Sequence, residues 1–421
     1  SRKIQPGQLF LALSGARDGH AFIPMALEKG AAAVLCTHCD GDFPAIVVED
    51  VRIALGKIAA GERQRIGMTV VGVTGSVGKS TTKEMIATVM GACHKTAKTP
   101  ANFNNDLGMP MSILDMPEDT QVAVLEMGMG NFGEIAYLTN IGEPDQAVII
   151  NIGTMHMEIL GSKEGILQAK MEILEGLHPD GKLFLNGDDN LLYSQKDKLG
   201  DRAVYFGTNP EKCKVWADHI EQGNGTVSYV AHCGEEAFSI SMPVEGLHHV
   251  IDSLAAVAVG LHMGIPAEKI ADSLSRFQNM EGRQEIFQAK GCTIIKDCYN
   301  AGPESMAAAL AVLGNRPSRK IAVLGDMLEL GVTTAAEHYK VGRMAAEQAD
   351  ILLSYGPNSH KMCSGAITGG MSGNFAKAFT DREKLANILC QMAKPGDTIL
   401  FKGSHGMHME LVLDIFLKTQ E

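Results

Sequence analysis

The apolar residues of this chain form short runs that alternate with segments of helical periodicity. Residues 68–73 are mostly apolar, which is typical of a buried strand, and apolar side chains at positions 85, 86, 89 and 90 fall on one face of a helix. The segment between them, residues 74–80, is rich in glycine. The order of strand, glycine-rich turn and helix predicts one unit of a parallel α/β sheet.

The same alternation runs along the whole chain. Further strands are predicted at residues 8–13, 32–35, 45–48, 121–126, 146–152, 181–185, 203–206, 292–297, 320–325, 350–354 and 397–401. Helices are predicted at residues 50–66 and 247–262, with short strands between 211 and 245. Since strands alternate with helices, we expect parallel sheets with crossover helices.

This pattern predicts an α/β protein of three domains. A small α/β domain covers residues 1–49, and a central domain with a parallel sheet covers residues 50–282 and contains the glycine-rich turn. A second doubly wound, Rossmann-like domain covers residues 283–421. Because Ser1 leads directly into an ordered-looking pattern, we also expect that an N-terminal piece precedes it.

Composition narrows the class of protein. The chain has 421 residues, 45% of them hydrophobic and 20% charged, as in a globular protein. A formal net charge of −12 argues against non-specific nucleic-acid binding and fits a cytoplasmic enzyme. No apolar run approaches the ~20 residues that span a bilayer, and no signal segment opens the chain. We expect no nucleic-acid partner and no transmembrane segment.

Cysteine spacing offers little support for a metal or redox site. Among nine cysteines, Cys36 and Cys39 form a CxxC pair. A zinc site would need a second pair at suitable spacing, and none is evident. We therefore favour a strand end followed by a turn at this pair, and reduced core thiols elsewhere.

The glycine-rich turn has the build of a phosphate-binding loop. Gly75 and Gly78 let backbone N–H groups approach an anion, and the helix that follows adds its partial positive charge. Lys79 can reach the outer phosphates of a nucleotide, and the Ser80 hydroxyl can bind Mg²⁺. Val73 occupies the position where this motif usually has glycine. An ordinary βα turn is the alternative, but it leaves Lys-Ser-Thr-Thr at the helix start unexplained. The segment comprises Thr74, Gly75, Ser76, Gly78, Lys79, Ser80 and Thr81.

Further candidates lie at the ends of other predicted strands. Glu126 ends a strand beside the phosphate loop, where a carboxylate that holds Mg²⁺ is expected. We therefore favour a metal-binding role for Glu126 over an exposed glutamate at a strand end. His156 follows the next strand and is another candidate ligand, although the signal is weak alone and a solvated loop histidine is nearly as good an interpretation. Lys170 lies in a helical stretch and reads from composition as a solvated lysine. Arg283 suits phosphate binding between domains, and Asp297 suits ribose binding, although each signal is weak alone.

These features leave two functional classes open. One is a Mg²⁺-dependent ligase or phosphotransferase that uses ATP or GTP, and the other is a nucleotide switch or motor that binds a macromolecular partner. A switch protein would carry a guanine-reading NKxD motif, which the chain lacks. Two further compact domains beside the nucleotide site favour an enzyme.

Several segments resemble the Mur ligase family of peptidoglycan synthesis, over essentially the whole chain. The phosphate loop reads GVTGSVGKSTT, as in that family, which accounts for Val73. The most specific segments are KDCYNAGPESM (296–306), LGDMLELG (324–331) and FKGSHGMHME (401–410), with support from TPANFNNDLGMP (99–110) and INIGTMHMEILGSKEGILQAKMEIL (150–174). The opening residues, SRKIQPGQLFLALSGARDGHAFI, resemble a UDP-substrate domain entered partway.

The resemblance implies an ADP-forming ligase that joins D-alanyl-D-alanine to UDP-N-acetylmuramoyl-tripeptide through an acyl phosphate. That reaction supplies the cell wall, on which bacterial shape and division depend. The enzyme would be a cytoplasmic monomer that closes its C-terminal domain over ATP to exclude water, and so would be open without ligands. The alternatives are a Mur-type ligase that adds a single amino acid, or a folylpolyglutamate synthase.

The resemblance also implies roles for individual residues. Two Mg²⁺ ions would be used, and Lys170 would be carbamoylated by CO₂ into an oxygen ligand, which reverses its reading as a solvated lysine. The implied metal ligands are Ser80, Glu126, His156 and Lys170, and the catalytic residues are Lys79, His156 and Lys170. ATP would also contact Asp252, Arg283, Asp297 and Tyr299. Substrate would be bound by Ser1, Arg2, Asn102, Asn104, Asn105, Asn300, Lys402 and Ser404.

Four positions depart from the family pattern. The usual Gly-x-His-Asn-x-x-Asn run appears with His249 and Asp252 in place of its two asparagines. An asparagine can pair with both N6 and N7 of adenine, whereas Asp252 can only accept from N6, so its adenine contact stays open. His405 stands where arginine is usual, and Gly302 where asparagine is common.

Overall fold

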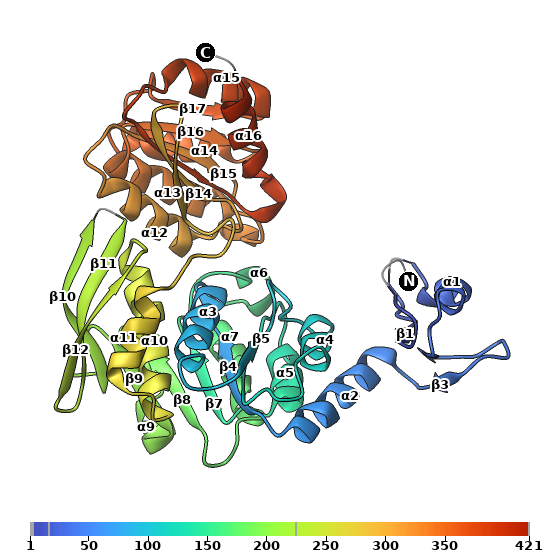
Figure 1. Ribbon diagram of the computed structural model, residues 1–421. Coiled ribbons are helices and arrows are strands. Elements are labelled where there is room, and N and C mark those ends of the chain that lie inside the picture. The colour runs from blue at the N-terminus through green and yellow to red at the C-terminus, as the bar shows by residue number, and fades with distance from the viewer. Residues whose placement is uncertain (1–3, 16, 224, 420–421) are drawn as a thin grey trace.

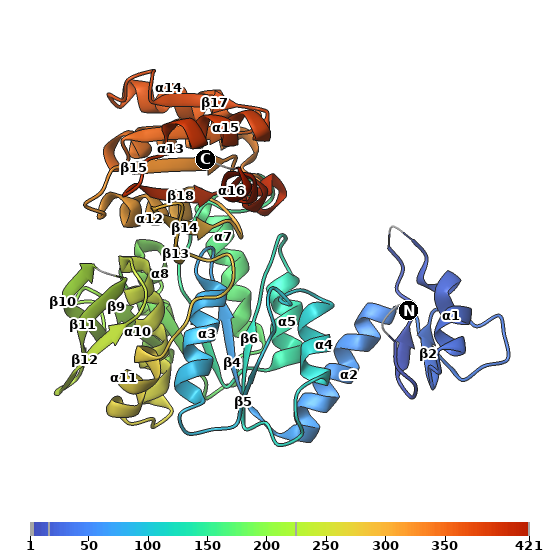
Figure 2. The same cartoon turned by 45° about the horizontal axis from the view of Figure 1, so that its top comes forward.

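The computed structural model describes residues 4–15, 17–223 and 225–419, and these form three α/β units, each with its own sheet (Figures 1 and 2). This architecture confirms the predicted fold class. Ser1 and Arg2, two expected substrate-binding residues, lie outside the described residues. Within the described residues no helix is both long and apolar enough to cross a bilayer.

The N-terminal unit is a small three-stranded parallel sheet in the order β1-β2-β3. Its elements are β1 (Leu9–Leu11), α1 (Ile23–Glu28), β2 (Ala33–Cys36) and β3 (Ala45–Val47). Both views show it standing to one side of the central unit, joined through α2 (Val51–Ile66). The Asp50 carboxylate caps the first turn of α2, and Gly67 ends the helix in the left-handed conformation, so this connection is well defined.

The central unit is built on a nine-stranded sheet in the order β12-β11-β10-β9-β8-β7-β4-β6-β5, parallel from β5 to β10 and antiparallel beyond. Its strands are β4 (Thr69–Thr74), β5 (Thr96–Lys98), β6 (Val122–Glu126), β7 (Gln146–Ile149), β8 (Lys182–Asn186), β9 (Ala203–Gly207), β10 (Val215–Gly223), β11 (Thr226–Cys233) and β12 (Glu236–Met242). Its helices after α2 are α3 (Lys79–Met90), α4 (Gly108–Leu114), α5 (Glu134–Gly142), α6 (Met157–Leu160), α7 (Lys163–Met171), α8 (Asn190–Tyr193), α9 (Lys196–Leu199), α10 (Leu247–His262) and α11 (Ala267–Ser275).

Helices cover both faces of this sheet and create two cores. One core joins α3, α10 and α11 to one face, and it buries the predicted apolar face of α3, including Met85, Ile86, Val89 and Met90. The other core lies on the opposite face, under α5 and α7. Strand β4 is therefore buried on both faces, which explains its apolar sequence and delivers the glycine-rich turn to the carboxyl edge of the sheet.

The C-terminal unit is a six-stranded sheet in the order β13-β14-β18-β15-β16-β17, parallel except for β13. Its strands are β13 (Glu285–Ala289), β14 (Cys292–Asp297), β15 (Lys320–Gly325), β16 (Ile351–Tyr355), β17 (Ala376–Phe379) and β18 (Thr398–Lys402). Its helices are α12 (Pro303–Gly314), α13 (Thr334–Gln348), α14 (Ser359–Thr368), α15 (Arg382–Met392) and α16 (Met409–Lys418). Figures 1 and 2 show α12 and the loops around it facing the central unit.

The cysteines behave as expected from their spacing. All nine are free, and five of them are buried. Cys36 ends β2 and Cys39 lies exposed in the irregular segment after it, so the prediction of a strand end at Cys36 is confirmed.

Candidate active site

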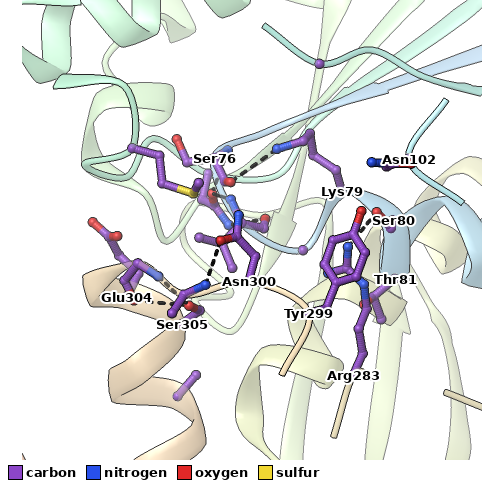
Figure 3. Close-up of a pocket in the computed structure, with 18 of the residues that line it drawn as sticks. Ser76, Lys79, Ser80, Thr81, Asn102, Arg283, Tyr299, Asn300, Glu304 and Ser305 are labelled. Atoms are coloured by element: carbon purple, nitrogen blue, oxygen red, sulfur yellow. Dashed lines mark hydrogen bonds between the residues drawn. The ribbon is translucent and has the colours of Figure 1, made fainter. Parts of the chain in front are cut away.

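A cleft of about 620 Å³ lies between the central and C-terminal units. The start of α3 and the loops after β6 and β7 form its central wall, and the segment before β13, the loop after β14 and the start of α12 form the other. Figure 3 shows Arg283 and Tyr299 reaching from the C-terminal wall towards Lys79 and Ser80. This position, outside the carboxyl ends of parallel strands, is where open α/β sheets bind ligands.

The glycine-rich turn has the backbone of a phosphate-binding loop. Gly78 has φ of +86°, a left-handed conformation that suits glycine, and a Cβ placed there would lie 2.6 Å from Oδ1 of Asp252. Asn151 fixes the turn from the end of β7, since its Oδ1 accepts the N–H groups of Ser76 (3.1 Å) and Val77 (2.9 Å). The turn is therefore held in shape by the chain itself.

Lys79 opens α3 and folds back over the turn. Its Nζ donates to the carbonyl oxygens of Gly75 (2.9 Å) and Ser76 (3.2 Å). Burial lowers the pKa of Lys79, and the positive charge of Arg283 adds to this effect, while Glu126 opposes it. Its charge is thus held next to the helix N-terminus, where an anion would bind.

Glu126 has the environment of a metal ligand. One carboxylate oxygen accepts from Nδ2 of Asn104 (2.8 Å), while Oε2 is buried without a hydrogen-bond partner. A buried carboxylate oxygen without a hydrogen bond is costly unless a cation approaches it, and here Nζ of Lys83 lies 3.6 Å away, beyond hydrogen-bond distance. The donor set thus fits Mg²⁺, which prefers oxygen ligands.

His156 lies on the same side of the cleft, in a left-handed conformation with φ of +63°. Burial lowers the pKa of His156, and the charge of Lys79 lowers it further. A neutral imidazole is the form that binds metals. Its Nδ1 is 3.6 Å from Oε2 of Glu329, which comes from the C-terminal unit.

Lys170 lies on α7 and is only 2% exposed. Its side chain is not among those that line the cleft. Burial holds the pKa of Lys170 well below that of an exposed lysine, and the charge of Lys79 adds to the effect. A lowered pKa favours the neutral amine of a lysine, which is the form that reacts with CO₂.

Arg283 makes a direct contact between the two units. Its guanidinium donates to Oγ of Ser80 (3.0 Å) and lies 4.1 Å over the ring of Tyr299. Nearby, Nζ of Lys402 donates to Oδ2 of Asp297 (2.7 Å) and to the carbonyl of Asn300 (2.9 Å). Lys402 is 2% exposed, so its first effect is to hold the loop that carries Asp297 and Asn300.

Asp252 is buried against the phosphate loop, at 4% exposure. Burial raises the pKa of Asp252 to about 8, with Thr82 and Arg283 opposing the shift. A pKa raised in this way favours the protonated carboxyl, which can donate a hydrogen bond as well as accept one. A neutral carboxyl has one O–H donor and a carbonyl acceptor, the same pair that an asparagine amide offers.

Most of the expected site residues come together in this cleft. Those that line it are Ser76, Gly78, Lys79, Ser80, Thr81, Asn102, Asn104, Asn105, Glu126, His156, Asp252, Arg283, Asp297, Tyr299, Asn300 and Lys402. Thr74 and Gly75 lie in the phosphate loop behind this lining, and Ser404 is buried, with its Oγ donating to the carbonyl of Ala301 (3.1 Å). Among the described residues no group of three or more His, Cys, Asp or Glu side chains is placed to hold a metal ion.

The cleft also contains polar residues that the sequence did not single out, and three of them make contacts that shape it. Asn151 holds the phosphate loop, Glu304 accepts from Oγ1 of Thr154 (3.1 Å), and Glu329 faces His156. Glu304 and Glu329 are contacts between the two units, and only their places inside the segments 296–306 and 324–331 could have signalled them.

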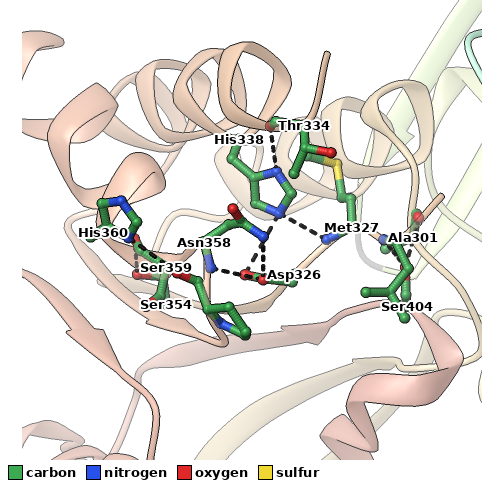
Figure 4. A network of polar contacts seen from close by, with 12 residues as sticks. Ala301, Asp326, Met327, Thr334, His338, Ser354, Asn358, Ser359, His360 and Ser404 are labelled. Carbon is green, nitrogen blue, oxygen red and sulfur yellow. Dashed lines mark hydrogen bonds and ion pairs between the residues drawn. The ribbon is translucent and has the colours of Figure 1, made fainter. Parts of the chain in front are cut away.

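A buried network fixes the loop that carries Glu329 (Figure 4). Oδ2 of Asp326 accepts from N and Nδ2 of Asn358, both at 2.9 Å. Nε2 of His338 accepts the N–H of Met327 (3.0 Å), while its Nδ1 donates to the carbonyl of Thr334 (2.7 Å). The loop after β15 therefore has a defined shape and presents Glu329 to the central unit.

Three domain families match the chain. Residues 73–260 match the Mur ligase middle domain, residues 282–405 match the glutamate ligase domain of Mur ligases, and residues 1–63 match the Mur ligase family catalytic domain. Two curated relatives are UDP-N-acetylmuramoyl-tripeptide--D-alanyl-D-alanine ligases. The Bacillus subtilis enzyme is 39% identical over 100% of this chain and 92% of its own length, and the Escherichia coli enzyme is 35% identical over 98% and 91%.

Solved structures agree with this match. A crystal structure of MurF from Acinetobacter baumannii superposes with a TM-score of 0.93 at 32% identity, covering 99% of this chain and 92% of that one. MurF from Thermotoga maritima in complex with ADP superposes with a TM-score of 0.89 at 29% identity, covering 99% and 96%. The similarity thus extends over all three units.

Proposed function

The chain belongs to the Mur ligase family, and we propose that it joins D-alanyl-D-alanine to UDP-N-acetylmuramoyl-tripeptide in an ATP-dependent, ADP-forming step of peptidoglycan synthesis. The observation that carries this proposal is the cleft in which a phosphate loop, Glu126 and Arg283 meet, in a chain similar over its full length to ligases of that name.

The chemistry follows from the need to activate a carboxylate. The terminal carboxylate of the tripeptide attacks the γ-phosphorus of ATP, forming an acyl phosphate and releasing ADP. The amine of D-alanyl-D-alanine then attacks the acyl carbon, the C–O bond to phosphate breaks, and the amine proton is lost to solvent. Lys79 and the N-terminus of α3 stabilise the charge that accumulates on the transferring phosphoryl group.

We propose that Ser80, Glu126, His156 and a carbamoylated Lys170 hold two Mg²⁺ ions. When bound, Mg²⁺ supplies charge neutralisation at the phosphates and orients them. Carbamoylation forms a bond between the neutral amine of Lys170 and the carbon of CO₂ and releases one proton. The lowered pKa of Lys170 and the absence of a hydrogen bond to the buried Oε2 of Glu126 support this assignment.

The remaining site residues are candidates for contacts with the nucleotide or with the muramyl-peptide substrate. We propose that Asp252, as a neutral acid, pairs with adenine, and that Asp297, Tyr299 and Arg283 bind the rest of the nucleotide. The expected muramyl-peptide loop contains Asn102, Asn104 and Asn105, with Asn300, Lys402 and Ser404 on the C-terminal side. Ser1 and Arg2 remain expectations for the UDP moiety.

We further propose the domain division 1–49, 50–282 and 283–421, with UDP-substrate, ATP and ligase roles in that order. Thr154 donates a hydrogen bond to Glu304 and Arg283 donates one to Ser80, so the last two domains are already in contact across the cleft. We propose that these contacts tighten when the C-terminal domain closes over ATP. The nucleotide and UDP-sugar substrates are consistent with a cytoplasmic enzyme.

Transfer of a labelled oxygen tests the mechanism. Tripeptide substrate carrying ¹⁸O in its terminal carboxylate should deliver one ¹⁸O to inorganic phosphate for each amide bond formed, because that oxygen bridges carbon and phosphorus in the acyl phosphate. Phosphate without label would exclude acyl-phosphate chemistry and favour a phosphate transfer to water, as in a nucleotide switch.

A further inference from the structure

Lys83 is a buried cation that the reaction described above does not use. It lies on α3, one turn after Lys79, and its side chain is fully buried. It is not among the residues that line the cleft. A buried lysine is uncommon unless its charge is paired and its N–H groups are hydrogen-bonded.

The ammonium of Lys83 is satisfied by two neighbouring structures at once. Its Nζ donates to the backbone carbonyls of Thr99 (2.8 Å) and Ala101 (3.2 Å), which start the loop containing Asn102, Asn104 and Asn105. The same Nζ lies 3.6 Å from Oε2 of Glu126 and 3.4 Å from Oε1 of Glu84. The ammonium of Lys83 thus joins this loop to Glu126, the carboxylate that we propose as a Mg²⁺ ligand.

Two further bonds connect the same partners. Oγ1 of Thr99 accepts the N–H of Glu126 (3.0 Å), and Nδ2 of Asn104 donates to Oε1 of Glu126 (2.8 Å). Between these points Ala101 has φ of +43°, a left-handed conformation that costs energy for a residue with a Cβ and persists only where neighbours enforce it. The bond from Lys83 to the Ala101 carbonyl is a direct restraint of that kind.

We propose that Lys83 is a positioning residue that couples the loop 99–105 to Glu126, so that the muramyl-peptide side and the metal side of the cleft keep one relative geometry. The assignment of the loop to substrate rests on the proposed function, whereas the coupling itself rests on the contacts of Lys83.

Hydrogen exchange tests the coupling without any ligation reaction. In Lys83→Met, the amides of Phe103, Asn104 and Gly128, which are bonded within or across the loop, should exchange at least about tenfold faster, while amides of α10 keep their rates. Lys98→Met is the matched control, because Lys98 also pairs with Glu84 but is partly exposed, and it should leave the loop amides unchanged. Wild-type exchange at these amides in Lys83→Met would overturn the proposal.

A second variant guards against a folding defect caused by an unpaired Glu126. Lys83→Met with Glu126→Gln removes both buried charges, and its loop amides should still exchange faster than those of Glu126→Gln alone. Equal exchange in these two proteins would also overturn the proposal.

Steady-state kinetics distinguish a positioning role of Lys83 from a purely structural one. Lys83→Met should raise KM for UDP-muramoyl-tripeptide about tenfold or more with a smaller change in KM for ATP, because the phosphate loop does not depend on Lys83. A fall in kcat with both KM values unchanged would indicate a merely structural role. If wild-type protein does not ligate at all, the proposed function fails, while the exchange result still decides the coupling.

Discussion

Asp252→Asn exchanges a buried acid for its neutral isostere, and it should change how stability depends on pH. The pKa of Asp252 rises from 3.8 in the unfolded chain to about 8 in the folded protein because the carboxyl is buried. The folded state therefore keeps a proton that the unfolded chain loses as pH rises from 3.8 to about 8. The free energy of unfolding falls through this window and levels off above it.

The size of the effect follows from the shift. One pKa unit corresponds to about 1.36 kcal/mol, so wild-type stability should fall by about 3 kcal/mol relative to Asp252→Asn between about pH 5 and about pH 7.5. Relaxation and water penetration reduce this figure, and we take about 1 kcal/mol as the smallest effect that supports a raised pKa of Asp252. The variant should be the more stable protein at neutral pH.

Trp216 provides the assay. It is the single tryptophan of the chain and lies in β10, which packs against the helix that carries Asp252. Urea unfolding followed by its fluorescence therefore reports on the unit concerned, at each pH and for both proteins. Parallel pH dependence of the two unfolding curves would refute a raised pKa for Asp252. A KM for ATP that rises above about pH 8 in wild type only would agree with adenine pairing by the neutral acid.

The remaining predictions concern the phosphate loop and Lys170. Lys79→Ala should lower kcat by at least about 100-fold in an ADP-release assay, since its charge is held beside the transferring phosphate, and retention of more than a few per cent of the rate contradicts this role. Lys170→Ala should be nearly inactive and partly restored by short carboxylic acids, which replace the carbamate oxygen; a wild-type rate rejects carbamoylation. Gly78→Ala should abolish nucleotide binding measured by calorimetry, because Gly78 has a left-handed φ and a Cβ there would meet the Asp252 carboxylate. Gly67→Ala is the control, because Gly67 is also left-handed but a Cβ there meets no other atom. It should cost about 1 kcal/mol of stability and leave nucleotide binding intact.

Much of this fold could be predicted from the chain because its central strands are buried on both faces. Strands β4, β6, β15 and β18 need continuous apolar runs, and those runs were visible. The strands that escaped prediction, β5, β13 and β17, all lie at sheet edges, are three to five residues long, and are partly exposed. An edge strand needs no apolar run, so its sequence resembles a loop.

The candidate site likewise contains residues whose place could be predicted from the sequence and residues whose place could not. The phosphate loop and Glu126 could be placed because they follow strands of one parallel sheet, whose carboxyl ends share an edge. The restraint by Asn151, the burial of Lys83 and the contact of Glu329 with His156 depend on how loops fold back, which periodicity does not encode. The protonation of Asp252 could not be inferred either, because its pKa is set by burial and not by the residue type.

Substrate omission tests the central claim most directly. Wild-type protein with Mg²⁺ and ATP should release ADP only when UDP-N-acetylmuramoyl-tripeptide and D-alanyl-D-alanine are both present, with one pentapeptide product per ADP. The tripeptide should be tried with either diaminopimelate or lysine as its third residue. Release should stay near background with D-alanine, glutamate or diaminopimelate as the amine, because a site that holds two residues leaves polar groups unpaired with one, at roughly 1–3 kcal/mol each. Equal turnover with glutamate and a folate, or ADP release that ignores every amine and responds to a protein partner, would contradict the assignment.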